Sequence, residues 1–107
     1  MADNNVEELI KTVQAHRGVT GYIIVNSEGI PIRHSFDEEH RLLAIHYAGL
    51  MQQLAQKAHA AVEDLSRATN EAGNDLVFIR LRSKKHEILV APGEKYLLIV
   101  IQTPQVG

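Results

Sequence analysis

The feature that most constrains this chain is one long amphipathic stretch between Asp37 and Ser66. Apolar residues recur there at the spacing of one helix face, which predicts a single helix that ends near residue 66. They are Leu43, Tyr47, Leu50, Met51, Leu54, Ala58, Ala61, Val62 and Leu65. At ~1.5 Å per residue this helix would be roughly 42 Å long, whereas a strand of about eight residues reaches only about 26 Å. An apolar stripe longer than its own sheet predicts that another subunit covers the remainder.

The segments before the long helix predict a short helix and a β-hairpin. Apolar residues at helical spacing indicate a helix over about residues 4–16. The β-branched run Val19–Val25 is followed by turn residues at Asn26–Gly29, and Ile30–Arg33 then resumes an extended pattern. Because Pro31 has no N–H to donate to a neighbouring strand, the second strand of this hairpin should lie at a sheet edge.

The segments after the long helix predict three more strands. A polar connector over Arg67–Asn74 leads into strands at Leu76–Leu81, Glu87–Ala91 and Lys95–Gln102. Tight connections between these strands make them antiparallel. The last strand is apolar on both faces, which is typical of a central strand. The order α-β-β-α-β-β-β predicts one α+β domain over residues 1–107, with a five-stranded antiparallel sheet.

The composition excludes several classes of protein. A net charge of −2 gives no reason to expect a nucleic acid or an anionic membrane as partner. The absence of cysteine excludes disulfides and thiolate metal sites. The polar N-terminus is unlike a signal peptide, and no apolar run approaches the ~20 residues of a membrane helix. We therefore expect a soluble, intracellular protein.

Residues that could carry chemistry do not combine into a catalytic or metal site in the sequence. Among the histidines of the predicted long helix, only His59 has a possible ligand four residues later, Glu63, and two ligands do not hold a metal ion. His34 and Ser35 are neighbours that would point to opposite faces of a strand. The acidic residues at 37–39 stand where a helix begins, and there negative charge complements the helix dipole. We expect no enzyme activity, no cofactor, no metal and no small-molecule substrate.

The most pronounced polar feature is the basic run from Arg80 to Lys85. It holds four of the chain's eleven lysines and arginines, and Arg80, Arg82 and Lys84 would share one face if the strand continued. This cluster could bind an acidic segment or a phosphate. It could equally protect an edge strand from unwanted pairing or form a solvated turn. Nucleic-acid binding is disfavoured, since no aromatic residues are interleaved for stacking.

Four segments resemble one known family. The run Asn74–Pro92 is similar to the signature of the roadblock family of dynein light chains, and Tyr96–Pro104 is similar to the family's final strand. Gly18–Gly21 and Val25–Ile32 match its first hairpin. The resemblance covers nearly the whole chain and is weakest between Asp37 and Ala72. Its connector, Ser66–Gly73, looks longer than in typical members.

The resemblance implies a sheet with strand order 2-1-5-4-3 between a short and a long helix. It also implies a homodimer, or a heterodimer with a second isoform, in which the long helices and third strands meet and the sheet continues across the dimer. The dimer would bind a helical segment of the dynein intermediate chain. By position, the dimer-interface candidates are Leu50, Leu54, Ala58, Leu76, Phe78 and Arg80. The basic run itself, and not the resemblance, supplies the partner-binding candidates Arg80, Arg82 and Lys84.

Two functions therefore remain. The first is a non-catalytic light chain of a microtubule motor that supports complex assembly, cargo attachment and transport or ciliary motility. The resemblance would place it in the cytoplasm and cytoskeleton, including the axoneme of a cilium or flagellum, and leaves open whether the dynein is cytoplasmic or axonemal. The alternative is a scaffold or regulator of a small GTPase built on the same fold.

Overall fold

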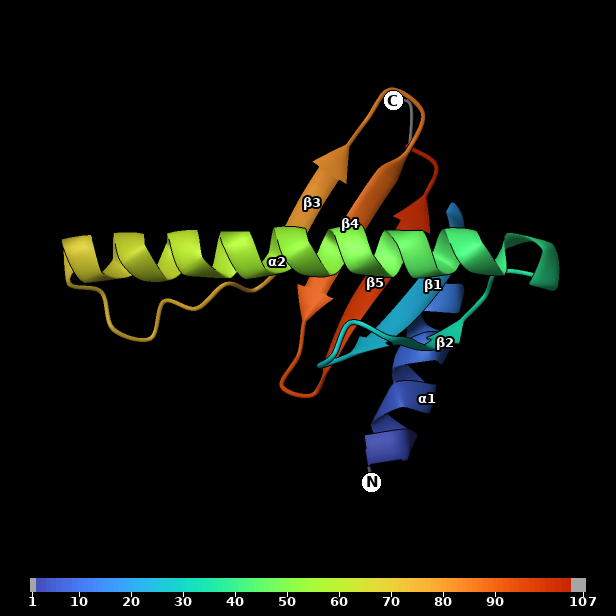
Figure 1. Cartoon of the computed structure of the whole chain (residues 1–107), viewed down its shortest axis with the longest axis horizontal. Helices are drawn as coiled ribbons and strands as arrows, with labels where there is room; N and C mark the ends of the chain where they lie inside the picture. The colour runs from blue at the N-terminus through green and yellow to red at the C-terminus, as the bar shows by residue number, and fades with distance from the viewer. Residues whose placement is uncertain (1, 105–107) are drawn as a thin grey trace.

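The computed structural model describes residues 2–104, and its elements follow the predicted order (Figure 1). They are α1 (Ala2–Gln14), β1 (Val19–Asn26), β2 (Pro31–His34), the 3-10 turn η1 (Glu38–His40), α2 (Arg41–Thr69), β3 (Ile79–Arg82), β4 (Glu87–Pro92) and β5 (Tyr96–Gln102). Within this part of the chain, no helix is both long and apolar enough to cross a membrane.

The five strands form one antiparallel sheet in the order β2-β1-β5-β4-β3. This confirms the predicted topology, including Pro31 on an edge strand and β5 at the centre. β5 is central because both its faces are apolar: Ile99 lies between Ile23 of β1 and Val90 of β4, and all three are fully buried. The two edges of the sheet are β2 and β3.

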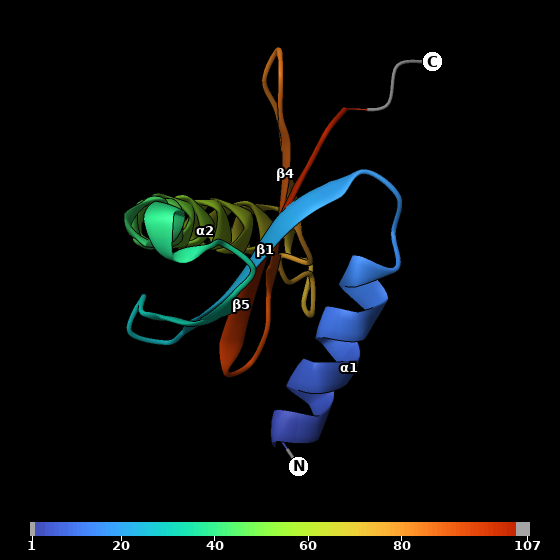
Figure 2. The ribbon, with the colours of Figure 1, turned by 90° about the vertical axis from the view of Figure 1, so that its right-hand side faces the viewer.

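The two helices lie on opposite faces of the sheet (Figure 2). On one face, α2 packs with the small side chains of Ala44 and Ala48, which are fully buried and allow the helix to approach the β-branched residues of β1, β4 and β5. On the other face, α1 packs Ile10 and Val13 over a second core, which includes Tyr22 of β1. Each face thus has its own apolar core.

The helix boundaries differ from the predicted ones by a few residues. α1 covers Ala2–Gln14 instead of residues 4–16, and α2 continues to Thr69, three residues past the expected end. Asn70 ends α2 in the left-handed conformation (φ 61°), and the N–H of Glu71 donates to the carbonyl of Ser66. The connector therefore starts at Asn70, so the connectors predicted from residue 66 or 67 were placed too early.

β3 is shorter than predicted, because Leu76–Phe78 is not part of the strand. β3 pairs with β4 in a register that sets Ile79 opposite Val90. Continued backwards, this register would bring Val77 opposite Pro92. Proline has no N–H to donate, so the ladder cannot extend in that direction.

Candidate interaction surfaces

The two flanks of α2 are in different environments. On one flank, the amide of Gln52 donates to the carbonyl of Ser27 in the β1–β2 turn (3.2 Å), and the hydroxyl of Ser66 donates to the carbonyl of Asn74 in the connector (3.3 Å). The opposite flank carries apolar residues that the subunit leaves partly uncovered. We call it the apolar flank, and it consists of Leu43, Leu50, Leu54, Ala58 and Leu65.

The exposure of the apolar flank is greatest at Leu65, beyond the sheet, and least at Leu54 and Ala58, which are half-buried. Leu43 and Leu50 are 44% and 47% exposed, and Leu65 is 64% exposed. Figure 1 shows the reason: the C-terminal half of α2 extends past β3, so no strand within residues 2–104 lies beneath it. The predicted interface residues Leu50, Leu54 and Ala58 therefore lie together on one surface, as expected from their spacing. Their role in a dimer stays a prediction.

The free edge at β3 is also apolar. Ile79 packs in the core under α2, and Leu81, two residues on, points to the same side but is 37% exposed. Just before the strand, Val77 and Phe78 are 74% and 57% exposed. Exposed apolar residues beside an unpaired strand edge are typical of a surface that another chain covers.

The predicted interface candidates Leu76, Phe78 and Arg80 do not share a strand face. Leu76 and Phe78 precede β3, and Leu76 is half-buried in a cleft beneath α2 while Phe78 is exposed. Arg80 alone lies in β3. Its cross-strand partner Leu89 packs in the α1-side core, so Arg80 points to that side. The predicted third strand, Leu76–Leu81, would have held all three residues, and that prediction is wrong for Leu76 and Phe78.

The basic cluster is also less uniform than the sequence suggests. Arg80 and Arg82 lie on the α1 side of β3, but Lys84 lies in the turn to β4, where Ser83 and His86 exchange hydrogen bonds. Arg80 is already paired, since its Nε lies 2.8 Å from a carboxylate oxygen of Glu87. Arg82 and Lys84 thus carry more of the uncompensated positive charge than Arg80 does.

Glu87 is a buried, paired carboxylate that sequence reasoning missed. It is 3% exposed and accepts hydrogen bonds from Arg80 and from the amide of Gln102. These bonds, that of Arg80 first and that of Gln102 second, hold the pKa of the Glu87 carboxyl below its ordinary value. The sequence did contain a signal for this contact, namely the positions of the polar residues along the last three strands. In antiparallel strands, polar residues at 80, 87 and 102 can meet on one face at the same end of the sheet.

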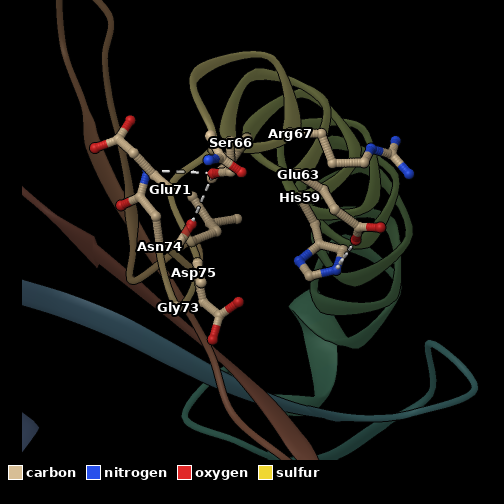
Figure 3. Close-up of a pocket in the computed structure, with 12 residues that line it drawn as sticks. His59, Glu63, Ser66, Arg67, Glu71, Gly73, Asn74 and Asp75 are labelled. Atoms are coloured by element: carbon tan, nitrogen blue, oxygen red, sulfur yellow. Dashed lines mark hydrogen bonds and ion pairs between the residues drawn. The ribbon is translucent and has the colours of Figure 1, made fainter.

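The cleft beneath the C-terminal half of α2 has a volume of about 290 Å³ and is lined by helix and connector residues (Figure 3). Some of its polar groups are paired with one another. His59 lies 3.3 Å from Glu63, which confirms the one histidine–carboxylate pair expected from spacing, and the Ser66 hydroxyl bonds to Asn74. Among the described residues of this cleft, no histidine is hydrogen-bonded to a serine, so the cleft lacks the pairing that activates a nucleophile.

One group of possible metal ligands does converge, contrary to the expectation that none would. Asp37, Glu39 and His40 place ligand atoms within 4.8 Å of one another, and all three residues are exposed. Asp37 caps η1 by accepting a hydrogen bond from the N–H of His40 and also contacts the His40 ring (2.6 Å). The His40 ring is the main cause that lowers the pKa of Asp37. Capping at the start of the helix explains this group without a metal.

The fold and its uncovered surfaces agree with one family. A sequence model described as the Roadblock/LC7 domain matches residues 5–103. The chain belongs to the Roadblock/LC7 family. This confirms the roadblock family and its fold as predicted from sequence, although the match does not single out the dynein light chains within it.

Solved roadblock structures are similar in fold. A Roadblock/LC7 domain from Streptomyces avermitilis is 17% identical, with 85% of this chain and 71% of that chain covered and a TM-score of 0.66. A structure described as MglB with a tetrameric arrangement is 15% identical, with 94% and 71% covered and a TM-score of 0.70. The gliding protein MglB from Thermus thermophilus is 19% identical, with 92% and 70% covered and a TM-score of 0.64. At these identities, the similarity establishes the common fold.

Proposed function

We propose that this chain is a non-catalytic interaction module that acts as a homodimer and serves as a scaffold or regulator of a small GTPase. The observation that carries the dimer is the apolar flank of α2, exposed next to the free edge of β3. A second copy would cover the flank and pair with the edge at the same time.

The choice of a GTPase as partner is supported by the comparisons. Among relatives of this fold, scaffolds and regulators of small GTPases are one of the two functions that the resemblance implies. The solved structures named above include MglB proteins, and none of them is described as a motor subunit. The description of one MglB as tetrameric is consistent with a roadblock protein that works as an assembly.

Affinity purification of the tagged chain from its native extract, followed by mass spectrometry, tests the partner. We expect a small GTPase to be recovered by the unmutated chain and to be reduced with a Leu50→Asp variant that disrupts the dimer. An Ile45→Asp variant on the opposite side of α2, at a residue that is 44% exposed, is the matched control and should recover the GTPase normally. Recovery of other proteins without any GTPase would contradict the proposal.

A second candidate is the dynein light chain, and the sequence motifs at Asn74–Pro92 and Tyr96–Pro104 favour it. In this function the dimer would bind a helical segment of the dynein intermediate chain, in the cytoplasm, on the cytoskeleton or in an axoneme. A surface suited to such a helix lies on the α1 side of the sheet, where Leu89, Ala91 and Tyr96 are only partly buried. Recovery of an intermediate chain in the same purification would decide for this candidate.

A further inference from the structure

Four polar side chains meet at one end of the sheet, on the α1 side. The β3–β4 register sets Arg82 opposite Glu87, and the β4–β5 register sets Glu87 opposite Gln102. Arg80 lies two residues before Arg82, so its side chain points to the same side of β3. We call this group the two-arginine site, and it consists of Arg80, Arg82, Glu87 and Gln102.

The buried carboxylate of this site holds Arg80 through only one nitrogen atom. The Nε of Arg80 donates to Oε2 of Glu87 over 2.8 Å, and the amide of Gln102 donates to Oε1 of the same carboxylate. Within residues 2–104, the two terminal amino groups of Arg80 make no hydrogen bond, and its side chain is 61% exposed. Glu87 therefore fixes the position of the guanidinium and leaves its outer edge available to a ligand.

The charges of the site do not cancel. The hydrogen bonds from Arg80 and Gln102 are the main causes that lower the pKa of Glu87, and the positive charge of Arg82 contributes as well. The exposed Arg82 thus acts on the same carboxylate as Arg80. Two guanidinium groups share one carboxylate, so one positive charge is left over. A single further anion that contacted both arginines would balance it.

A carboxylate matches this remainder better than a phosphate does. A carboxylate carries one negative charge, whereas a phosphorylated side chain carries about −1.5 to −2 at pH 7. Its two coplanar oxygens also match the fork of N–H groups that a guanidinium presents. On the same side of the sheet, Leu89, Ala91 and Tyr96 are only partly buried, and Leu89 is the cross-strand partner of Arg80. Apolar residues beside the carboxylate would therefore find a surface to pack on.

We propose that the two-arginine site binds the carboxylate of an aspartate or glutamate side chain of the partner protein. Arg80 and Arg82 donate to its oxygens, and Glu87 is a positioning residue that acts through Arg80. The site lies on the face opposite α2, so the proposed homodimer leaves this face open. The inference rests on the proposed function in one respect, namely that the ligand belongs to a protein.

Acetate and inorganic phosphate are the probes for the purified chain, at constant ionic strength. The nitrogen-15 NMR signals of the arginine Nε–H groups report on the site, and we expect acetate to shift those of Arg80 and Arg82 with saturation. Arg82→Gln should weaken acetate binding about tenfold or more, because a charge-assisted hydrogen bond is lost. Lys85→Gln is the matched control, since it removes the same charge from an exposed residue of the β3–β4 turn, and it should keep the affinity.

Arg80→Lys separates the fork of N–H groups from the charge. Lysine keeps the positive charge but lacks the planar fork, so acetate binding should weaken in this variant too. Shifts that do not saturate, or equal weakening by Arg82→Gln and Lys85→Gln, would show diffuse attraction in place of a site and would overturn the proposal. Tighter binding of phosphate than of acetate would overturn the choice of a carboxylate. Should Arg80→Lys not fold, Arg82→Gln decides, because Arg82 is exposed and outside the bonds that hold Glu87.

The partner recovered by affinity purification gives the second measurement. Its dissociation constant should rise about tenfold with Arg82→Gln and stay unchanged with Lys85→Gln. It should also rise when acetate replaces chloride at equal ionic strength. A partner whose affinity is indifferent to Arg82→Gln would contradict the inference even if acetate binds. If the recovered partner is not a small GTPase, the proposed function fails, while the same measurements still decide on the two-arginine site.

Discussion

Replacing Leu50 by aspartate should dissociate the dimer without unfolding the subunit. Leu50 is 47% exposed in the isolated chain, so a carboxylate there can stay hydrated in a monomer. In the proposed dimer, each copy would lose the burial of about half a leucine, roughly 1 kcal/mol. Each would also desolvate a carboxylate, at a cost of at least ~1–3 kcal/mol.

Two copies contribute to every dimer, so the total loss is about 4–8 kcal/mol. Because each ~1.4 kcal/mol changes the dissociation constant tenfold, the dissociation constant should rise about a thousandfold or more. Size-exclusion chromatography with light scattering, from about 1 to 100 μM, measures this shift. Ile45→Asp, on the opposite side of α2 and 44% exposed, is the control and should remain a dimer. A Leu50→Asp chain that stays dimeric at 1 μM would refute the assignment of the apolar flank as the interface.

Four further results are expected. Glu87→Gln should lower the free energy of unfolding near pH 7. This loss relative to the unmutated chain should shrink as the pH falls below 4.5, the ordinary pKa of a glutamate. The reason is that a carboxyl whose pKa is lowered by folding stabilises the fold only while it is ionised. Urea unfolding at several pH values measures this trend. Arg82→Glu combined with Lys84→Glu should slow partner association in stopped-flow or surface-based kinetics, most strongly at low salt. Arg80→Glu should instead destabilise the fold itself, because it places a carboxylate next to buried Glu87. Ala48→Leu should lower the free energy of unfolding by roughly 1–3 kcal/mol, because Ala48 is fully buried between α2 and the sheet. Ala60→Leu, on the exposed side of α2, should lower it far less. Equal losses for the two variants would contradict the packing of α2. Adding a chelator should leave the melting temperature unchanged, and a drop of several degrees would mean that Asp37, Glu39 and His40 hold a structural ion.

The topology was predictable because the decisive residues act locally. Pro31 cannot sit inside a sheet, and a strand that is apolar on both faces has to be central, so one edge and the middle of the sheet followed from sequence. The long helix followed from its repeating apolar positions. Its end at Thr69 did not, since the apolar stripe stops at Leu65 while the helix continues to the left-handed residue Asn70.

The surfaces were less predictable because they depend on pairing across strands. Alternation alone placed Leu76 and Phe78 in β3, but the proline opposite the strand's beginning ends the ladder. The cluster of arginines and lysines looked uniform until Glu87, brought beside Arg80 by the β3–β4 register, neutralised one member. Likewise, the convergence of Asp37 with His40 arises from the 3-10 turn η1, which the sequence did not predict.

The overhang of α2 has a consequence for how this protein is maintained. An isolated helical segment of about 15 residues is only marginally stable in water, and the C-terminal half of α2 has no strand of the described part of its chain beneath it (Figure 1). If a second copy supplies that surface, folding of this half and assembly become one process. Mass action then makes the melting temperature rise with protein concentration. A cell that changes the amount of this chain, or of an isoform able to pair with it, would thereby change how long each copy stays folded.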